Sequence, residues 1–250
     1  MEKIKVAAVS YLNTKPLLYG ITRDAELMQQ IELIEDFPSR IGQMLVDDEV
    51  DLGLIPVAYI SRLKEWHIIS GYGIGSTGPV ETVCLFSDVP VEQIEKVLLD
   101  YQSFSSVNLC KVLLKHYWKK EVVFEQATEN YIDEIGGTTA GVIIGDRVFE
   151  QKAVAQPKKF IYDLAEEWTY FTELPFLMAA WISNKALPKD FIERFDAANR
   201  VGLDDIDAVI AENPYTKYDL HTYFTGNISY TIDEDKLKAM HLFLKLMNEL

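Results

Sequence analysis

The stretch Val9-Ser-Tyr-Leu-Asn-Thr-Lys-Pro-Leu17 decides how this chain folds, because an apolar strand runs there directly into the start of a helix. The strand is expected over Ile4–Ser10. Pro16 fits the first turn of the following helix, where its missing N–H is not needed, and Asn13 or Thr14 is placed to cap that turn. The pattern predicts a cup of backbone at the carboxyl end of the strand.

Polar side chains surround this predicted cup. Ser10, Tyr11 and Asn13 lie at the end of the strand or just after it, and the unpaired N–H groups of a helix start suit a small anion. We therefore expect these three residues to contact such a ligand. The alternative interpretation is an ordinary capped helix after the first strand, without a binding role.

The composition indicates a globular protein with an acidic surface. The chain has 250 residues, of which 48% are hydrophobic, so it can bury a full core in one large domain or in two smaller ones. The formal net charge of −15 argues against a nucleic-acid partner, since no basic stripe is present to bind phosphates. Any anionic ligand must then be held by local hydrogen-bond donors.

The sequence predicts a cytoplasmic location without a membrane association. Its start, Met-Glu-Lys-Ile-Lys-Val, has no long apolar region followed by a cleavage site, and no segment is apolar for the roughly 20 residues of a membrane span. Two isolated cysteines, Cys84 and Cys110, stand in apolar surroundings. We expect them to be reduced core thiols and not a disulfide.

Short β-branched runs alternate with helical patterns, which is typical of an α/β fold. The expected strands are Ile4–Ser10, Ile31–Glu35, Asp51–Ile55, His67–Ser70, Val80–Ser87, Lys96–Asp100, Val122–Glu125, Gly141–Gly145 and Phe176–Ser183. Two amphipathic helices are clearest, one marked by Cys110, Leu113, Leu114 and Tyr117 and a final one by Leu237, Met240, Leu244 and Met247.

Two long apolar strands, Val80–Ser87 and Phe176–Ser183, are candidates for crossings between two domains, because no flexible linker is present. We expect a discontinuous first domain of residues 1–87 and 180–250, and an inserted second domain of residues 88–179. A ligand cleft would then lie between them.

The run Gly73-Ile-Gly-Ser-Thr-Gly78 satisfies the dinucleotide fingerprint G-x-G-x-x-G. A dinucleotide loop must open into a helix, whereas Pro79 and Val80 continue here as an extended segment. We interpret these glycines as a tight turn that leads into the crossing strand, and we expect no nucleotide cofactor.

Two further strand ends carry possible anion-binding groups. Ser103, Ser105 and Ser106 stand at the start of the helix that follows Asp100, where hydroxyl caps leave N–H donors for a carboxylate. The run Gly145-Asp146-Arg147 repeats the arrangement after another strand. Simple capping is the alternative in both places, but open α/β sheets bind ligands at the carboxyl ends of their strands.

The sequence does not bring together the residues that a metal site or a histidine-based active site requires. The four histidines, His67, His116, His221 and His241, are far apart, so we expect neither a metal site nor a histidine-based triad. Asp163, Glu166 and Glu167 are expected in the first turn of a helix, where carboxylates suit the helix dipole.

Taken in order along most of the chain, these motifs resemble the chorismate dehydratase family of the futalosine route to menaquinone. The segments that carry the resemblance are Ser10-Tyr-Leu-Asn13, Pro16-Leu17, Asp51–Pro56, Gly78-Pro-Val80, Ile144-Gly-Asp146, Asp163-Leu164, Glu166-Glu-Trp168 and Leu174-Pro-Phe176. The Ser-Tyr-Leu-Asn segment distinguishes this family from the sister 1,4-dihydroxy-6-naphthoate synthase. The resemblance implies a fold like that of type II periplasmic binding proteins.

The resemblance also implies the reaction and the site. Chorismate would lose water without any cofactor, with Asn13 and Thr82 as the catalytic residues. Substrate contacts are expected from Ser10, Tyr11, Pro56, Gly78, Ser103, Ser105, Ser106, Gly145 and Asp146. The alternatives are a small-anion solute-binding protein without chemistry and the sister synthase, and the oligomeric state stays open.

This chain departs from the family pattern at three positions. Thr82 replaces a serine and keeps its hydroxyl, Ala165 replaces a glycine, and Phe104 stands where an arginine is expected. The lost arginine puts one carboxylate contact in question. Arg147, Arg40 and Lys15 are the cations considered as replacements.

Overall fold

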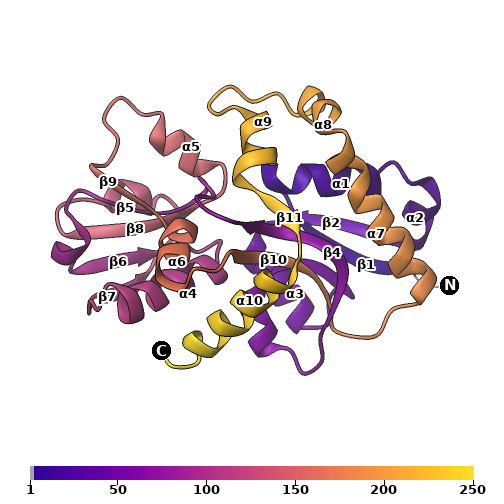
Figure 1. Cartoon of the computed structure of the whole chain (residues 1–250), viewed down its shortest axis with the longest axis horizontal. Helices are drawn as coiled ribbons and strands as arrows, with labels where there is room; N and C mark the ends of the chain where they lie inside the picture. Colours follow the sequence, from indigo (N-terminus) through magenta and orange to yellow (C-terminus); the bar gives the residue numbers. More distant parts are fainter. Residues whose placement is uncertain (1–2) are drawn as a thin grey trace.

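The computed structural model describes residues 3–250 and contains two β-sheets, each with its own helices (Figure 1). The six-stranded sheet has the order β11-β4-β10-β3-β1-β2. Its strands are β1 (Ile4–Val9), β2 (Ile31–Asp36), β3 (Leu52–Pro56), β4 (His67–Ser76), β10 (Phe176–Ser183) and β11 (Ser229–Thr231). β1 runs parallel to β2 and β3, whereas β10 is antiparallel to both β3 and β4.

The five-stranded sheet has the order β7-β6-β8-β5-β9. Its strands are β5 (Val83–Ser87), β6 (Lys96–Leu99), β7 (Val123–Gln126), β8 (Thr139–Ile144) and β9 (Phe160–Asp163). β6 is parallel to β7 and β8, and β5 is antiparallel to β8 and β9. We call the six-stranded sheet with its helices the first lobe, and the five-stranded sheet with its helices the second lobe.

Helices pack on both sheets. The first lobe carries α1 (Lys15–Ile21), α2 (Ala25–Gln30), α3 (Pro38–Val46), α7 (Lys189–Asp204) and α8 (Ile206–Glu212). The second carries α4 (Ser105–Val112), α5 (Arg147–Lys152) and α6 (Leu164–Thr172). Short helical segments used below are η1 (Leu12–Thr14), η2 (Val57–Arg62), η4 (Leu113–Tyr117), α9 (Leu220–Thr222) and η6 (Tyr223–Asn227), of which η4 and η6 are π-helical.

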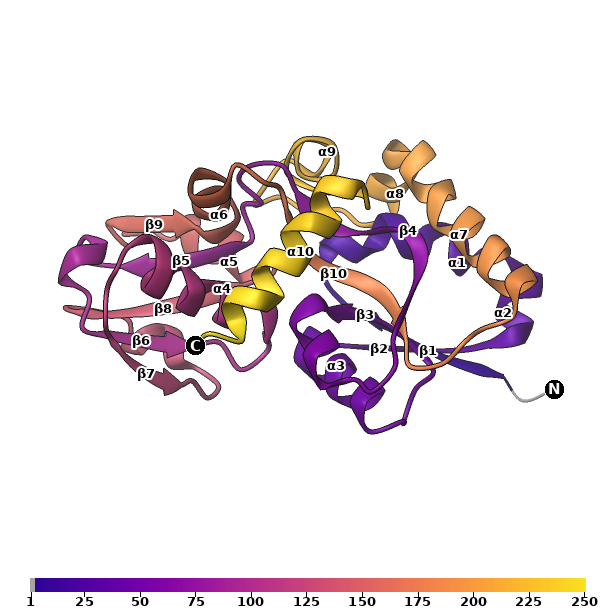
Figure 2. The ribbon, with the colours of Figure 1, turned by 60° about the horizontal axis from the view of Figure 1, so that its bottom comes forward.

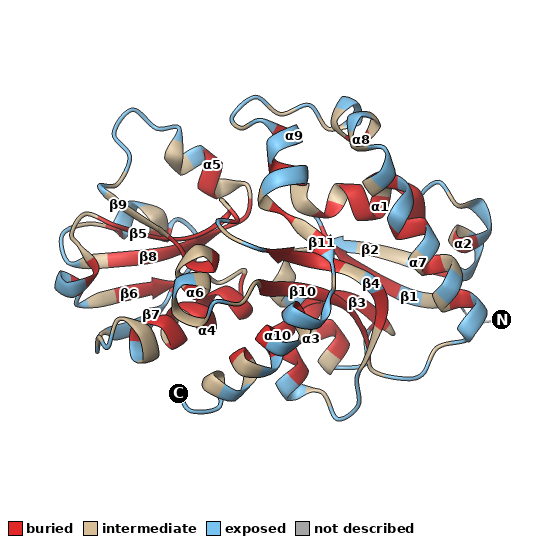
Figure 3. Ribbon diagram, viewed as in Figure 1, coloured by how far each residue is buried: buried red, intermediate tan, exposed pale blue. Residues whose placement is uncertain are grey.

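The core is continuous through both lobes. Every residue of β3, β5 and β10 is buried (Figure 3), and the main apolar cluster includes side chains from both sheets. Cys84 and Cys110 are free and fully buried, as expected, and burial raises the pKa of both thiols.

The last helix, α10 (Glu234–Met247), lies across the boundary between the lobes (Figure 2). The Phe243 ring centroid is 5.1 Å from that of Phe176 in β10 and 6.1 Å from that of Trp168 in α6. These aromatic contacts join the final helix to both lobes. The two chain crossings are therefore not the only connection between them.

Most expected strands are confirmed, with shifts of one to a few residues at their ends, but β9 and β11 were not predicted. The interpretation of the glycine run as a turn is wrong, because Gly73 and Gly75 lie inside β4. A Cβ atom would lie 2.6 Å from Ala179 O at Gly73 and 2.8 Å from Phe176 O at Gly75. These glycines allow close backbone approach to β10.

The expected helices are also present. Cys110 lies in α4, and the rest of its stripe continues into the π-helical segment η4. Pro16 stands in the first turn of α1, but neither Asn13 nor Thr14 caps that helix through its side chain, so this part of the prediction is wrong. Asp163 caps α6, and its carboxylate accepts from the N–H groups of Ala165 and Glu166.

The chain passes from one sheet to the other a few residues before each expected domain boundary. β5 pairs within the second sheet, although residues up to 87 were assigned to the first domain, and β10 pairs wholly within the first sheet. The expected crossing strand Val80–Ser87 begins only at Val83, and Val80–Thr82 form an irregular connection. The domain division at residues 87 and 179 stays a prediction. Within residues 3–250, no helix is both long and apolar enough to span a membrane.

Candidate functional site

A pocket lies between the lobes, at the ends of strands from both sheets. Its cavity measures about 60 Å³, which holds several water molecules, because one water needs roughly 10–15 Å³ on this measure. The lining residues are Val9, Tyr11, Asn13, Pro38, Pro56, Ile74, Val80, Thr82, Val83, Ser103, Ser105, Ser106, Ile144, Gly145, Met178 and Ala179. None of these side chains is acidic, basic or a histidine.

The pocket brings together most of the residues that the sequence singled out. Those lining it are Tyr11, Asn13, Pro56, Thr82, Ser103, Ser105, Ser106 and Gly145. Three others do not line it. Ser10 is exposed and its N–H donates to Asp36 O, Gly78 lies in the connection after β4, and Asp146 lies behind Gly145.

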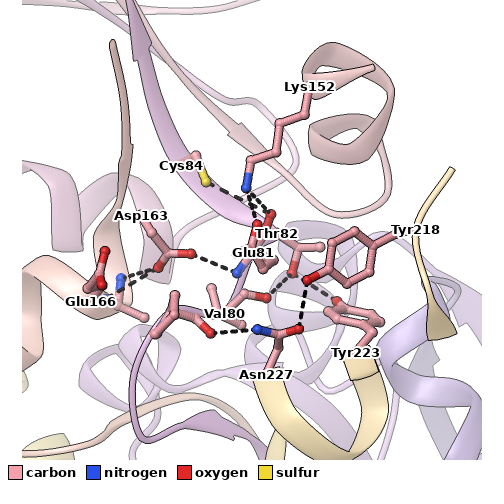
Figure 4. Close-up of polar contacts among 12 residues, drawn as sticks. Val80, Glu81, Thr82, Cys84, Lys152, Asp163, Glu166, Tyr218, Tyr223 and Asn227 are labelled. Atoms are coloured by element: carbon pink, nitrogen blue, oxygen red, sulfur yellow. Dashed lines mark hydrogen bonds and ion pairs between the residues drawn. The ribbon is translucent and has the colours of Figure 1, made fainter. Parts of the chain in front are cut away.

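Thr82 has a buried hydroxyl partner that no sequence motif indicated. Its Oγ1 lies 2.8 Å from the hydroxyl oxygen of Tyr223 and 3.4 Å from Val80 O (Figure 4). Tyr223 is fully buried, and burial raises the pKa of its phenol far above the usual value although hydrogen bonding to Thr82 and Asn13 opposes this. The phenol therefore stays protonated and lies beside Thr82, one of the two expected catalytic residues.

Asn13 is held by a second tyrosine from the same part of the chain. The hydroxyl of Tyr230 donates to Asn13 O at 3.0 Å, and Thr14 Oγ1 donates to Asn13 Oδ1 at 3.3 Å. Because both contacts fix the Asn13 segment, its side chain enters the pocket from a defined position. Tyr223 and Tyr230 lie about 200 residues further along the chain, where no local pattern marks them.

The start of the helical segment after β1 binds a carboxylate of the protein itself. Leu12 N donates to Asp146 Oδ2 across the lobes at 3.3 Å. Gly145 adopts φ +68°, and a Cβ atom there would lie 2.8 Å from the Tyr11 ring, so glycine is required for this approach. The Tyr11 hydroxyl donates to Gln102 Oε1, which is another contact between the lobes.

The serines at the start of α4 are also engaged. Ser105 Oγ accepts from Ala58 N across the lobes at 3.0 Å, and Ser103 Oγ accepts from Ser106 N at 3.0 Å. Ser39 adds two cross-lobe bonds, from its N–H to Gln102 O at 3.1 Å and from its Oγ to Tyr101 O at 2.9 Å. These contacts hold the two lobes together, and we call this arrangement the closed form.

Asp146 is an unusual carboxylate at this closed boundary. Its Oδ1 is buried and has no hydrogen-bond partner among the described residues, whereas its Oδ2 accepts from Leu12 N. Burial raises the pKa of Asp146 to about 6, although the Leu12 N–H opposes the shift. A neutral Asp146 is thus better accommodated in the closed form than an ionised one.

The first crossing between the lobes contains a left-handed residue. Glu81 has φ +68°, its N–H donates to Asp163 Oδ2 at 2.7 Å, and its carboxylate pairs with Lys152 (Figure 4). Asp163 is also buried, which raises its pKa to about 6. Such a conformation is uncommon for a residue with a side chain, and these partners hold it in place.

The three cations considered as replacements for the family arginine are used elsewhere. Arg147 pairs with the buried Asp100 at 2.6 Å, Arg40 with Glu49 at 2.9 Å and Lys15 with Glu35 at 3.2 Å. None of them lines the pocket. The pocket offers amide and hydroxyl donors in an apolar wall, which suits the orientation of oxygen atoms and the exclusion of water. Between residues 3 and 250, no cluster of three potential metal ligands is found.

Residues 4–249 match a family model described as menaquinone biosynthesis. This chain belongs to the menaquinone biosynthesis family. A chorismate dehydratase of Thermus thermophilus, also similar to this chain, is 22% identical to it over 95% of this chain and 92% of that protein. The sequence resemblance is thereby confirmed at the level of the family.

Solved structures confirm the periplasmic-binding-protein-like fold of this menaquinone biosynthesis family member. A protein from Archaeoglobus fulgidus superposes with a TM-score of 0.77 at 15% identity, covering 99% of this chain and 97% of that one. A Candida albicans protein with the generic periplasmic binding protein fold gives 0.66 at 16% identity, covering 100% and 91%. The alkanesulfonate-binding protein SsuA of Xanthomonas axonopodis, bound to MOPS, gives 0.65 at 11%, covering 99% and 92%.

Proposed function

We propose that this chain is a chorismate dehydratase, which converts chorismate into 3-[(1-carboxyvinyl)oxy]benzoate and water. The observation that carries the proposal is the pocket that Asn13 and Thr82 both line, with the Tyr223 hydroxyl beside Thr82 and with no acidic, basic or histidine side chain in the lining. The curated relative with this activity supports it. We further propose that the enzyme acts in the futalosine route to menaquinone, in the cytoplasm, without a cofactor.

The reaction needs little chemistry from the protein. Loss of the ring hydroxyl and of the proton beside the enolpyruvyl ether forms an aromatic ring, and this aromatisation drives the elimination. The remaining work is to orient the ring, to exclude water and to stabilise the charge on the departing oxygen. A closed, largely apolar pocket with a few fixed donors provides these conditions.

Asn13 and Thr82 are the proposed contacts to the reacting part of the ring. The Asn13 amide and the Thr82 hydroxyl donate to the leaving hydroxyl or to a carboxylate of the substrate. Tyr223 is a positioning residue, because its hydroxyl lies 2.8 Å from Thr82 Oγ1 and fixes the direction of that group. Ser105 and Ser106 would bind the other carboxylate once Ser105 leaves Ala58 N.

The proton acceptor is proposed to be the enolpyruvyl carboxylate of the substrate itself. No aspartate, glutamate, lysine or histidine lines the pocket, and the one phenol beside Thr82 stays protonated. A substrate carboxylate held next to the labile proton would take it within one bound molecule. The carbon–oxygen bond to the ring hydroxyl then breaks, the proton held by the carboxyl group passes to the departing oxygen, and this oxygen leaves as water.

Incubation of the purified protein with chorismate tests this proposal. We expect the benzoate product by liquid chromatography and mass spectrometry, with treatment by a chelator leaving the rate unchanged. Asn13→Ala is the matched inactive variant, since its side chain lines the pocket and packs no core. Chorismate that binds and is recovered unaltered would instead indicate a solute-binding protein, and a naphthoate product from a cyclic futalosine derivative would indicate the sister synthase.

A further inference from the structure

A second groove lies at the boundary between the lobes, next to the pocket. It measures about 430 Å³, and Ser103 lines both spaces. Arg40 and Arg62 reach it from α3 and η2 of the first lobe, and Lys111 reaches it from α4 of the second. The proposed reaction does not use this groove, which is open to solvent in the closed form.

The charge of the groove is opposite to that of the whole chain. The chain carries a net charge of −15, yet the groove is lined by Arg40, Arg62 and Lys111 and by no aspartate or glutamate. Within the described residues, neither Arg62 nor Lys111 forms an ion pair with a carboxylate. Arg40 pairs with Glu49, but both side chains are close to half exposed. The groove is therefore a local attractor for anions.

Two aromatic rings, those of Tyr59 and Phe104, form part of the groove wall. The Arg62 guanidinium carbon lies 4.0 Å from the Phe104 ring centroid and 5.3 Å from that of Tyr59. The two rings are themselves 4.6 Å apart. This stacking orients the guanidinium without using its N–H donors, which stay available for a carboxylate. A planar ring that carries a carboxylate matches both features.

We propose that this groove is an outer binding site for a small cyclic carboxylate, which holds the substrate before it enters the inner pocket. The role as a waiting site for substrate rests on the proposed dehydratase function. The pocket has no cation of its own, whereas a doubly charged substrate must approach an acidic protein. A cationic groove beside the pocket raises the local substrate concentration and the rate of association.

A binding experiment tests the site without any turnover. Benzoate, the simplest aromatic carboxylate, is titrated into wild type, Arg62→Met, Arg200→Met and Asn13→Ala, with heat or NMR shifts as the readout. Met keeps most of the length of arginine but has no charge. Arg200→Met is the matched control, because Arg200 pairs with Asp204 on the exposed face of α7. Thermal melting verifies that each variant is folded.

We expect wild type, Arg200→Met and Asn13→Ala to bind benzoate equally, and Arg62→Met to bind it at least about fivefold more weakly. Binding should also weaken as KCl rises from 50 to 300 mM. Equal binding by Arg62→Met, loss in Asn13→Ala alone, or no binding by wild type would each overturn the outer site. Because benzoate is not converted, these results do not depend on whether chorismate is dehydrated.

A kinetic experiment tests the coupling to the reaction. If chorismate is converted, Arg62→Met combined with Lys111→Met should lower kcat/KM by roughly threefold to tenfold, mostly through KM, and should reduce its dependence on salt. Arg200→Met should leave both values at the wild-type level. A fall in kcat alone, with an unchanged salt dependence, would contradict a role in substrate capture.

Discussion

The hydroxyl of Tyr223 lies 2.8 Å from Thr82 Oγ1, although the two residues are 141 positions apart in the sequence. Tyr223 belongs to η6 and Thr82 to the first crossing between the lobes. The Tyr223 ring also contacts Phe149 of α5, at 5.1 Å between centroids. The segment after α8 thus contacts both Thr82 and the second lobe.

Tyr223→Phe should remove the hydroxyl that positions Thr82 while it keeps the packing of the ring. The ring stays, so the contact with Phe149 is kept, and the loss of one buried hydrogen bond costs about 1 kcal/mol of unfolding free energy. We expect kcat for chorismate to fall roughly tenfold or more, with little change in KM. Tyr218→Phe is the control, because its hydroxyl contacts Asn227 and not Thr82. Equal kcat values in both variants would remove Tyr223 from the site.

Thr82→Val should be severely impaired, because valine keeps the shape of the side chain and removes only the hydroxyl. We expect kcat to fall by a factor of about 100, as for the loss of a fixed donor to a developing charge. Thr82→Ser should retain most of the activity and thereby show that the hydroxyl is the required group. Near wild-type turnover by the valine variant would show that the Thr82 hydroxyl has no role in the reaction and that Thr82 only connects the lobes.

Asp146→Asn should stabilise the protein at neutral pH and not in acid. The folded protein raises the pKa of Asp146 from 3.8 to about 6, so it binds this proton more tightly than the unfolded chain does. The resulting destabilisation is absent below about pH 4, grows between pH 4 and 6, and is complete above pH 6.

Urea unfolding at pH 4 and pH 7.5 measures this difference. The asparagine keeps an oxygen for Leu12 N and has no charge, so we expect a gain of about 1–2 kcal/mol at pH 7.5 and none at pH 4. Asp207→Asn, at an exposed position of α8, is the control. A gain of the same size at both pH values would refute the titration of Asp146 as the cause.

Ser105→Ala should weaken closure of the lobes around a ligand, because it removes a second-lobe hydroxyl that is proposed to donate to a carboxylate of the bound molecule. Small-angle scattering is expected to show that the benzoate product makes wild type more compact. The alanine variant should need about fivefold more product for the same effect, which corresponds to about 1 kcal/mol. Ser61→Ala, which breaks a bond to Ala58 O within one lobe, is the control. An unchanged radius of gyration in saturated wild type would indicate a preformed pocket.

The sequence predicted the parts of the fold that local pattern determines. Strands such as Phe176–Ser183 are continuous apolar runs because both their faces are buried, and this composition is visible in one dimension. β9 was missed because Phe160–Tyr162 are only partly buried and the strand is short, and β11 has three residues. Gly73 and Gly75 were misinterpreted because glycine is needed there to let the backbone of β10 come close. Only the folded sheet brings that strand near.

Part of the site was also predictable from the sequence. Asn13 follows the end of an apolar run, so the rule that ligands bind at strand ends indicated it, whereas Thr82 was named only from the family resemblance. Tyr223 and Tyr230 come from segments without a chemical motif, and only tertiary packing places their hydroxyls beside those residues. The cation over Phe104 was missed for the same reason, since Arg62 comes from the opposite lobe.

The position of β10 between β3 and β4 has a consequence for the order of events during synthesis. All strands of the five-stranded sheet lie between residues 83 and 163, so a ribosome delivers that sheet as one uninterrupted run. The six-stranded sheet lacks its central strand until Ser183 has emerged, which leaves β3 and β4 with unpaired edges in the nascent chain. The part of the molecule that is inserted in sequence is therefore the first that is able to fold.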